Sequence, residues 1–157
     1  MNLYHGSYMK IEKPILNFSN KNGDFGPGFY LTSDFEQASS WAVKKVAKLE
    51  QGNPTVSIYN YNENNNDLKI KKFTSADEEW FEYVVNNRKN LTNDNYDIVE
   101  GPVANDGTYE VINLYIRGIL TKKQAISRLK TYKLKDQLNF KTDKAISKLT
   151  FEGVEKI

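Results

Sequence analysis

The sequence contains no cysteine and only one histidine, and both scarcities limit the chemistry open to it. Without cysteine there is no disulfide and no thiolate, and His5 alone cannot assemble a His/Cys zinc site. No apolar run approaches the roughly 20 residues of a membrane span, and the chain does not open with a basic stretch followed by an apolar segment. We therefore expect a cytoplasmic protein that has no metal centre and no membrane partner.

The material that is present fits one folded domain. Of 157 residues, 39% are hydrophobic and 13% aromatic, which is enough to bury a core, so we expect a single domain spanning residues 1–157. The net charge of +2 conceals an asymmetry, because residues 117–157 carry 11 Lys/Arg against 4 Asp/Glu. A basic C-terminal quarter favours an anionic partner, and it also fits a solvated lysine-rich surface.

Short strands and helices follow one another along the chain, so the pattern predicts the α+β class. Capping residues mark the helices, with Asp34, Thr121 and Thr142 as N-caps and a Ser75–Glu78 capping box. The expected helices are 35–49, 75–88, 108–120, 122–130 and 142–148. The expected strands are 2–7, 28–32, 55–62, 68–73, 96–99, 134–140 and 149–157, with 55–62 and 68–73 as a hairpin and Gly101-Pro102 ending a strand.

Side-chain alternation also predicts which residues are buried. In the strand around "LKDQLNF", Leu138 and Phe140 should face the core, and Gln137 and Asn139 should form a polar face. Trp41 and Trp80 lie on apolar helix faces and are expected in the core.

Three polar residues, His5, Tyr30 and Gln137, are predicted on strands or at strand ends. The segments that carry them, "LYHGS", "DFGPGFYLT" and "LKDQLNF", resemble the three motif strands of the ADP-ribosyltransferase fold, in the His-Tyr-Glu branch shared by diphtheria toxin and the poly(ADP-ribose) polymerases. With "QASSWA" and "YDIVEGPVAND" added, the series is similar to a family of small bacterial domains of unknown or toxin-like function. The resemblance covers nearly the whole chain and implies a split, mixed or antiparallel β core with flanking helices.

The resemblance further implies NAD as a substrate and a reaction without a metal. In that family the histidine binds a ribose hydroxyl, the following glycine holds the nicotinamide amide, and the tyrosine stacks on nicotinamide, which gives roles to His5, Gly6 and Tyr30. Such a site works chiefly by orienting the dinucleotide. The residues implied to contact NAD are His5, Gly6, Ser7, Asp24, Phe25, Gly26, Gly28, Phe29, Tyr30 and Asp106.

The third motif position departs from the family pattern. Many members have glutamate there, whereas Gln137 can form hydrogen bonds but cannot act as a carboxylate base. Asp136 should point to the opposite face of the strand. Asp106 could lend a carboxylate from a nearby loop, or it could be an ordinary turn residue.

Several alternatives stay open. Each of the three polar residues could be structural, as a satisfied histidine, a core aromatic and a surface strand residue. A phosphate loop at "DFGPG" lacks the glycine and lysine spacing of a P-loop, and a hydrolase built on Ser7 or Ser33 with His5 lacks a third orienting group.

The leading hypothesis is a mono-ADP-ribosyltransferase that modifies a nucleic acid or a protein, as the toxin of a bacterial toxin–antitoxin or defence module with an antitoxin partner. The second is a non-transferring NAD- or nucleotide-binding module. The third is a nucleic-acid-binding interaction domain, although the chain lacks the basic, aromatic-interleaved motif of an RNA reader.

Overall fold

A computed structural model describes residues 1–16, 23–64, 67–104, 106–130 and 133–157, and within them the strands form two sheets. The first sheet is antiparallel in the order β1-β3-β7, formed by β1 (Asn2–Ser7), β3 (Thr55–Tyr61) and β7 (Leu149–Lys156). The second has the order β2-β6-β5-β4 and comprises β2 (Phe29–Leu31), β6 (Asp136–Phe140), β5 (Ile98–Pro102) and β4 (Ile70–Lys72). A backbone bridge between Tyr4 and Thr32, with N–H···O distances of 2.9 and 3.0 Å, joins the two sheets.

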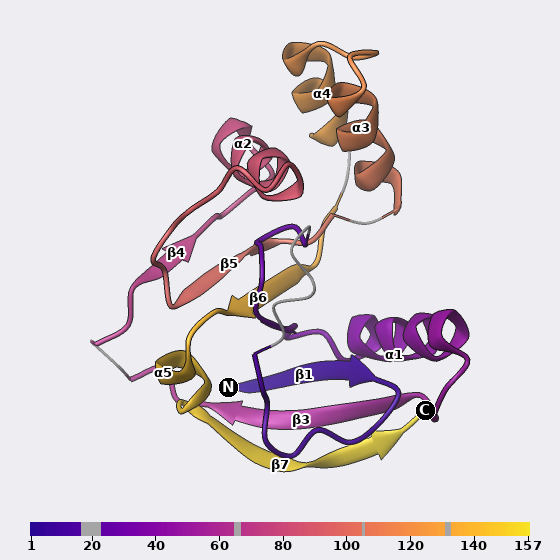
Figure 1. Ribbon diagram of the computed structural model, residues 1–157, viewed down its shortest axis with the longest axis vertical. Helices are drawn as coiled ribbons and strands as arrows, with labels where there is room; N and C mark the ends of the chain where they lie inside the picture. Colours follow the sequence, from indigo (N-terminus) through magenta and orange to yellow (C-terminus); the bar gives the residue numbers. More distant parts are fainter. Residues whose placement is uncertain (17–22, 65–66, 105, 131–132) are drawn as a thin grey trace.

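Three of the helices gather at one end of this arrangement, and α1 lies alongside the first sheet (Figure 1). Helix α1 (Phe35–Leu49) packs on β1, whereas α2 (Glu78–Arg88), α3 (Asp106–Ile116) and α4 (Lys122–Leu129) lie beyond the second sheet. The short helix α5 (Asp143–Ile146) connects β6 to β7.

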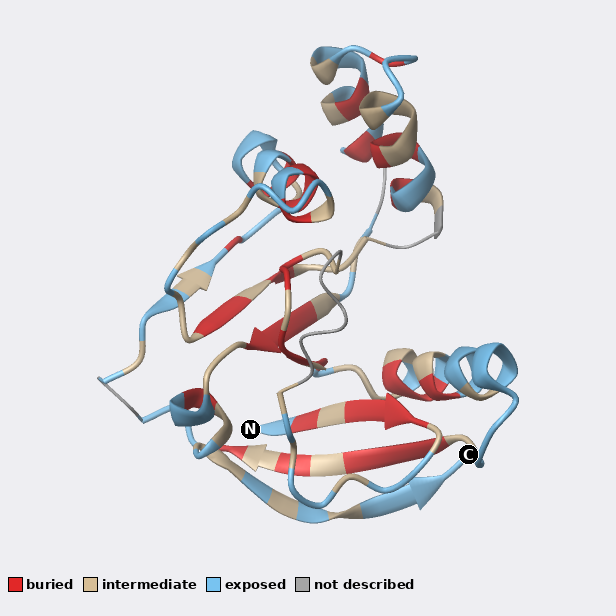
Figure 2. Ribbon diagram, in the orientation of Figure 1, coloured by how far each residue is buried: buried red, intermediate tan, exposed pale blue. Residues whose placement is uncertain are grey.

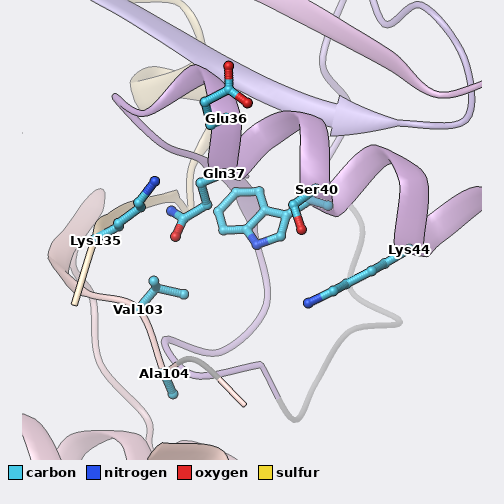
Figure 3. Close-up of a pocket in the computed structure, with 8 residues that line it drawn as sticks. Glu36, Gln37, Ser40, Lys44, Val103, Ala104 and Lys135 are labelled. Atoms are coloured by element: carbon cyan, nitrogen blue, oxygen red, sulfur yellow. The ribbon is translucent and has the colours of Figure 1, made fainter. Parts of the chain in front are cut away.

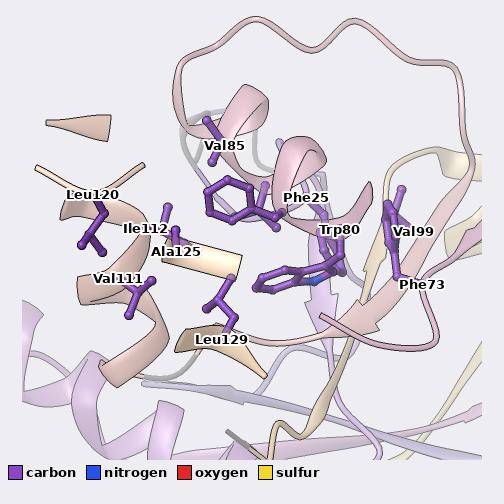
Figure 4. Close-up of a cluster of buried hydrophobic side chains, with 12 residues drawn as sticks. Phe25, Phe73, Trp80, Val85, Val99, Val111, Ile112, Leu120, Ala125 and Leu129 are labelled. Carbon is purple, nitrogen blue, oxygen red and sulfur yellow. The ribbon is translucent and has the colours of Figure 1, made fainter. Parts of the chain in front are cut away.

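Two clusters of buried hydrophobic side chains lie on opposite faces of the second sheet. Buried residues are coloured red in Figure 2. The inter-sheet cluster combines side chains of both sheets: Leu3, Phe29, Leu31, Tyr59, Tyr61, Ile98, Leu138, Phe140 and Ala145. The helix-side cluster, drawn in Figure 4, joins the sheet to α2, α3 and α4: Phe25, Phe73, Trp80, Phe81, Val84, Val85, Val99, Val111, Ile112, Leu120, Ala125 and Leu129. Because side chains alternate along β2, Phe29 and Leu31 lie in the inter-sheet cluster, whereas Tyr30 packs against the helix-side cluster.

Local signals predicted most elements correctly. The α+β class is confirmed, and the side chain of Asp34 caps α1 by accepting the Gln37 backbone N–H at 2.7 Å. Thr121 and Gln124 form the predicted capping box of α4, and Thr142 caps α5. The segment 108–120, for which a helix was favoured, contains most of α3.

Three predictions about these elements are wrong. The hairpin of 55–62 with 68–73 does not form, because β1 and β7 flank β3, and β4 pairs in parallel with β5. The N-cap of α2 is Asp77 rather than Ser75. The strand expected over 96–99 runs through Gly101 to Pro102, since β6 continues to pair with it. The predicted polar face of β6 does form, and the structure shows that it too is buried, since Gln137 and Asn139 are nearly as inaccessible as Leu138 and Phe140.

Candidate functional site

His5 lies on the face of β1 that carries Leu3 and is a neutral, interior imidazole. Its Nδ1 is 2.6 Å from the carbonyl oxygen of Tyr30, so Nδ1 must carry the proton and donate it. The ring stacks on Phe29 with centroids 4.2 Å apart. Burial lowers the pKa of His5 to about 4, so the ring is uncharged at neutral pH.

The segment 23–28, called here the glycine loop, is held by hydrogen bonds from three side chains of the second sheet and the residue after it. The Tyr30 hydroxyl accepts the Phe25 backbone N–H at 3.1 Å and donates to the Gly26 carbonyl oxygen, and burial raises the pKa of Tyr30. Asn139 and Lys141 donate to carbonyl oxygens of the same loop, including that of Phe25 at 3.0 and 2.9 Å. These hydrogen bonds fix the backbone of the glycine loop against the second sheet.

Asp24, at the start of the glycine loop, forms a buried cluster with Gln137. Its Oδ1 accepts from Arg88 Nη2 at 2.7 Å and Nε at 3.2 Å. Its Oδ2 accepts the backbone N–H of Ala104 and the side-chain Nε2 of Gln137, both at 3.3 Å. The Arg88 guanidinium also lies 4.0 Å from the ring centre of Tyr109. This Asp24–Gln137 cluster pairs one carboxylate with one cation and one amide.

A pocket of about 360 Å³ opens between α1 and the chain that follows β5 (Figure 3). Its lining residues are Glu36, Gln37, Ser40, Trp41, Lys44, Val103, Ala104 and Lys135. The expectation that Trp41 is a core residue is wrong, because its side chain is partly exposed on the pocket wall. Its neighbours one helical turn away, Gln37 and Lys44, are polar, and that signal in the sequence could have revealed it.

One residue of the pocket lining contacts the Asp24–Gln137 cluster directly, and two others contact or belong to the segment that leads to Gln137. Ala104 lines the pocket and donates its backbone N–H to Asp24. Gln37 lines it and donates from Nε2 to the carbonyl oxygen of Asp136, 2.7 Å away. Lys135 lies two residues before Gln137 on the same segment. Ala104 is therefore the residue that the pocket wall and the cluster share.

The structure brings some of the predicted residues together and separates others. Tyr30, Asp24 and Gln137 meet around the glycine loop on the helix side of the second sheet. The His5 ring lies on the other face, with Phe29, and reaches Tyr30 only through its backbone. The side chains of His5, Tyr30 and Gln137 therefore do not all lie on one face of the second sheet, and the lining of this pocket includes none of them.

The remaining predicted contact residues have structural surroundings of their own. A Cβ on Gly6 would lie 2.0 Å from the Ala38 carbonyl oxygen, so glycine is needed there for α1 to approach β1. Gly28 is equally close to the Asn139 side chain, and Ser7 is buried at the end of β1. The side chains of Phe25 and Phe29 lie in the two core clusters, which leaves only their backbone for a ligand.

Two predicted acidic residues have different outcomes. Asp136 does point away from the Gln137 partners, accepting hydrogen bonds from Thr32 and Ser33. Asp106 is the first residue of α3 rather than part of a loop, and its side chain lies outside the described part of the structure.

The described residues contain no group of three or more His, Cys, Asp or Glu side chains that could hold a metal ion. Among the helices described, none is long and apolar enough to span a bilayer.

The fold and the pocket define an α+β protein with a ligand-sized pocket between α1 and the end of β5. The sequence profile of the DUF3990 family, described as a protein of unknown function, matches residues 1–151, and the chain belongs to this family. No curated protein and no solved structure matches the chain.

Proposed function

We propose that this protein is a mono-ADP-ribosyltransferase that consumes NAD. The observation that carries the proposal is the pocket beside the Asp24–Gln137 cluster, joined to it through Ala104. The resemblance of the three motif segments to ADP-ribosyltransferases supplies the reaction, and the pocket supplies a place for the dinucleotide.

The chemistry of the pocket lining supports a nucleotide ligand. An indole face, as on Trp41, suits a planar nicotinamide or adenine ring, and the cationic groups of Lys44 and Lys135 suit phosphates. Figure 3 shows Lys44 extending towards the space between α1 and Ala104. A volume of about 360 Å³ is in the range of small-molecule sites.

The three motif residues then each have a defined task. Bound NAD supplies the bond that breaks, between the nicotinamide nitrogen and the ribose, whose electron pair leaves with nicotinamide. The acceptor atom bonds to the same ribose carbon and releases its proton to water, since the Gln137 amide cannot take it. Gln137 orients the ribose, while His5 and Tyr30 hold the glycine loop and β2 in register.

A second candidate is a module that binds NAD or a nucleotide without transferring anything. One observation favours it: the only carboxylate in direct contact with Gln137 within the described chain, Asp24, is fully engaged by hydrogen bonds. Within the described chain, Gln137 therefore has no free carboxylate in contact with it that could act as a general base for an acceptor.

The acceptor and the biological setting belong to the same proposal. We propose a nucleic acid or a protein as the acceptor, and a bacterial toxin–antitoxin or defence module, with an antitoxin as the partner. The resemblance supports the setting. The exposed Lys130, Lys133 and Lys135, which precede β6, support an anionic acceptor.

Incubation of the purified chain with labelled NAD and separate protein, RNA and DNA pools tests the proposal. Wild-type protein should release nicotinamide and label one pool, and Gln137→Ala should lower turnover more than affinity. Gln51→Ala, at an exposed position after α1, is the matched control. Binding of NAD without nicotinamide release would favour the second candidate, and no binding would overturn both.

A further inference from the structure

The amide of Gln137 has a defined orientation, because its partner can only accept hydrogen bonds. An ionised Asp24 carboxylate has no proton to donate, so the amide group facing it at 3.3 Å must be the NH2. The carbonyl oxygen Oε1 of Gln137 consequently points away from Asp24. Within the described part of the chain, no donor contacts this oxygen.

Asp24 itself has no remaining capacity to act on a substrate. A carboxylate offers about four acceptor positions, and here two are taken by Arg88, one by Ala104 and one by Gln137. The carboxylate is also largely buried, with 13% of its side chain exposed against 7% for Arg88. Asp24 is therefore fixed in place and engaged on every side.

We infer that Asp24 is a positioning residue that sets the Gln137 amide so that Oε1 accepts a hydrogen bond from a ribose hydroxyl. The inference rests on the proposed function, because it names the group that orients the ribose. The two orientations of an amide have the same shape and differ only in which atom faces the substrate. A glutamine so held keeps the acceptor part of a glutamate's task and lacks only the proton transfer.

An exchange of the two functional groups tests this assignment. Asp24→Asn places an NH2 group against either Arg88 or the Gln137 amide. Because Arg88 is charged and donates two hydrogen bonds to one oxygen, the remaining oxygen of the new amide should stay with Arg88. The NH2 then faces Gln137 and should turn its amide around, while the Ala104 N–H loses its acceptor. The double variant Asp24→Asn/Gln137→Glu restores a donor opposite an acceptor with the roles reversed, and presents a carboxylate oxygen to the ribose. It also retains one carboxylate in the cluster, which keeps the test usable if the single variant does not fold.

Asp94→Asn is the matched control. Asp94 is an equally exposed carboxylate, at 13%, in an ion pair with Lys141 at 3.3 Å, and its hydrogen-bond partners do not include Gln137. The variant therefore reproduces the loss of a largely buried ion pair while leaving the Gln137 amide in place.

Two readouts are needed. In nicotinamide release, Asp24→Asn should lower kcat about tenfold, the loss expected for one hydrogen bond, with KM little changed, and the double variant should recover most of it. In NMR spectra, the side-chain amide protons of Gln137 should exchange slowly in the wild type and faster in Asp24→Asn, and should be unaffected in Asp94→Asn.

The outcomes separate the inference from the proposed function. Equal losses of kcat in Asp24→Asn and Asp94→Asn, or an unchanged Gln137 amide signal in Asp24→Asn, would overturn the positioning role. A wild-type protein that releases no nicotinamide overturns the proposed function and the role in turnover with it. The amide signal then still decides whether Asp24 sets the Gln137 orientation.

Discussion

The Nδ1 atom of His5 lies 2.6 Å from the carbonyl oxygen of Tyr30. This hydrogen bond, from a side chain of β1 to the backbone of β2, connects the first two motif strands. The ring donates its one proton inward and stacks on Phe29. A histidine held in this way contributes to stability in a pH-dependent manner.

Stability should fall on acidification because of His5. Its pKa is lowered by burial from 6.5 to about 4, so between these values the unfolded chain binds the proton and the folded chain does not. The contribution is fully present above pH 6.5 and decreases as the pH falls, by about 2 kcal/mol between pH 6.5 and 5. Urea unfolding at several pH values measures it, and His5→Gln should lack this slope. An NMR titration that finds a His5 pKa near 6.5 would contradict the prediction.

Gly6→Ala should destabilise the fold strongly. The new Cβ would lie 2.0 Å from the Ala38 carbonyl oxygen and 2.8 Å from the Ala42 nitrogen, both helix backbone atoms that cannot rotate away. We expect a loss of about 3 kcal/mol or more in the free energy of unfolding. Gly118→Ala is the control, since its Cβ meets open space and only its positive φ costs about 1–2 kcal/mol. Equal losses in the two variants would show that the α1–β1 approach is looser than described.

Tyr30→Phe should weaken the glycine loop while keeping the aromatic ring. Removal of the hydroxyl leaves the Phe25 N–H without its acceptor and the Gly26 carbonyl without this donor, at a cost of about 1–3 kcal/mol. Denaturant unfolding measures the cost. Tyr4→Phe serves as the control, because its ring packs edge-on against Phe35 and its hydroxyl has no hydrogen bond within the described residues. A Tyr30→Phe protein as stable as this control would contradict the described loop contacts.

Trp41→Ala should weaken NAD binding by about tenfold to a hundredfold if the indole stacks on a ring of the ligand. Val43→Ala, on the same helix but outside the pocket lining, should not. Calorimetry gives the affinities. Fluorescence offers a direct check, because the chain has two tryptophans and Trp80 is fully buried, so quenching by NAD should disappear in Trp41→Ala. Unchanged affinity would remove Trp41 from the site.

Modification of a nucleic acid acceptor should fall steeply as salt rises, and reversal of charge at Lys130, Lys133 and Lys135 should weaken it. Reversal at Lys130 and Lys133 alone should weaken it without changing nicotinamide release, because Lys135 also lines the pocket. Lys135 is paired with Asp34 at 2.9 Å, so its share should be the smallest.

The control reverses Lys10, Lys13 and Lys156, three exposed lysines of which Lys10 is likewise paired, with Glu12. Labelling confined to protein, without dependence on either set, would contradict a nucleic acid acceptor.

The features predicted correctly from the sequence are those that a few neighbouring residues decide. The Asp34 cap of α1 and the Thr121–Gln124 box of α4 each need only contacts within one turn. The pairing of β4 could not be predicted, because it depends on strands that are distant in the sequence.

Burial of the polar face of β6 was hidden for a similar reason. The amides of Gln137 and Asn139 are buried because the glycine loop folds over them and accepts their hydrogen bonds. The alternation of polar and apolar residues in "DQLNF" is the same whether water or a loop covers the polar face. The Asp24–Gln137 cluster could therefore be recognised only in three dimensions.

The pocket has one wall on each half of the molecule, since α1 rides on the first sheet and Ala104 follows β5 of the second. The backbone bridge described between the halves is the single Tyr4–Thr32 pair. The inter-sheet cluster and the Gln37–Asp136 hydrogen bond also hold the two halves together, so the width of the pocket is set by how the two sheets pack. A molecule that contacts both walls should stabilise this packing, and slower exchange of the Tyr4 and Thr32 amide protons would report the effect from outside the pocket.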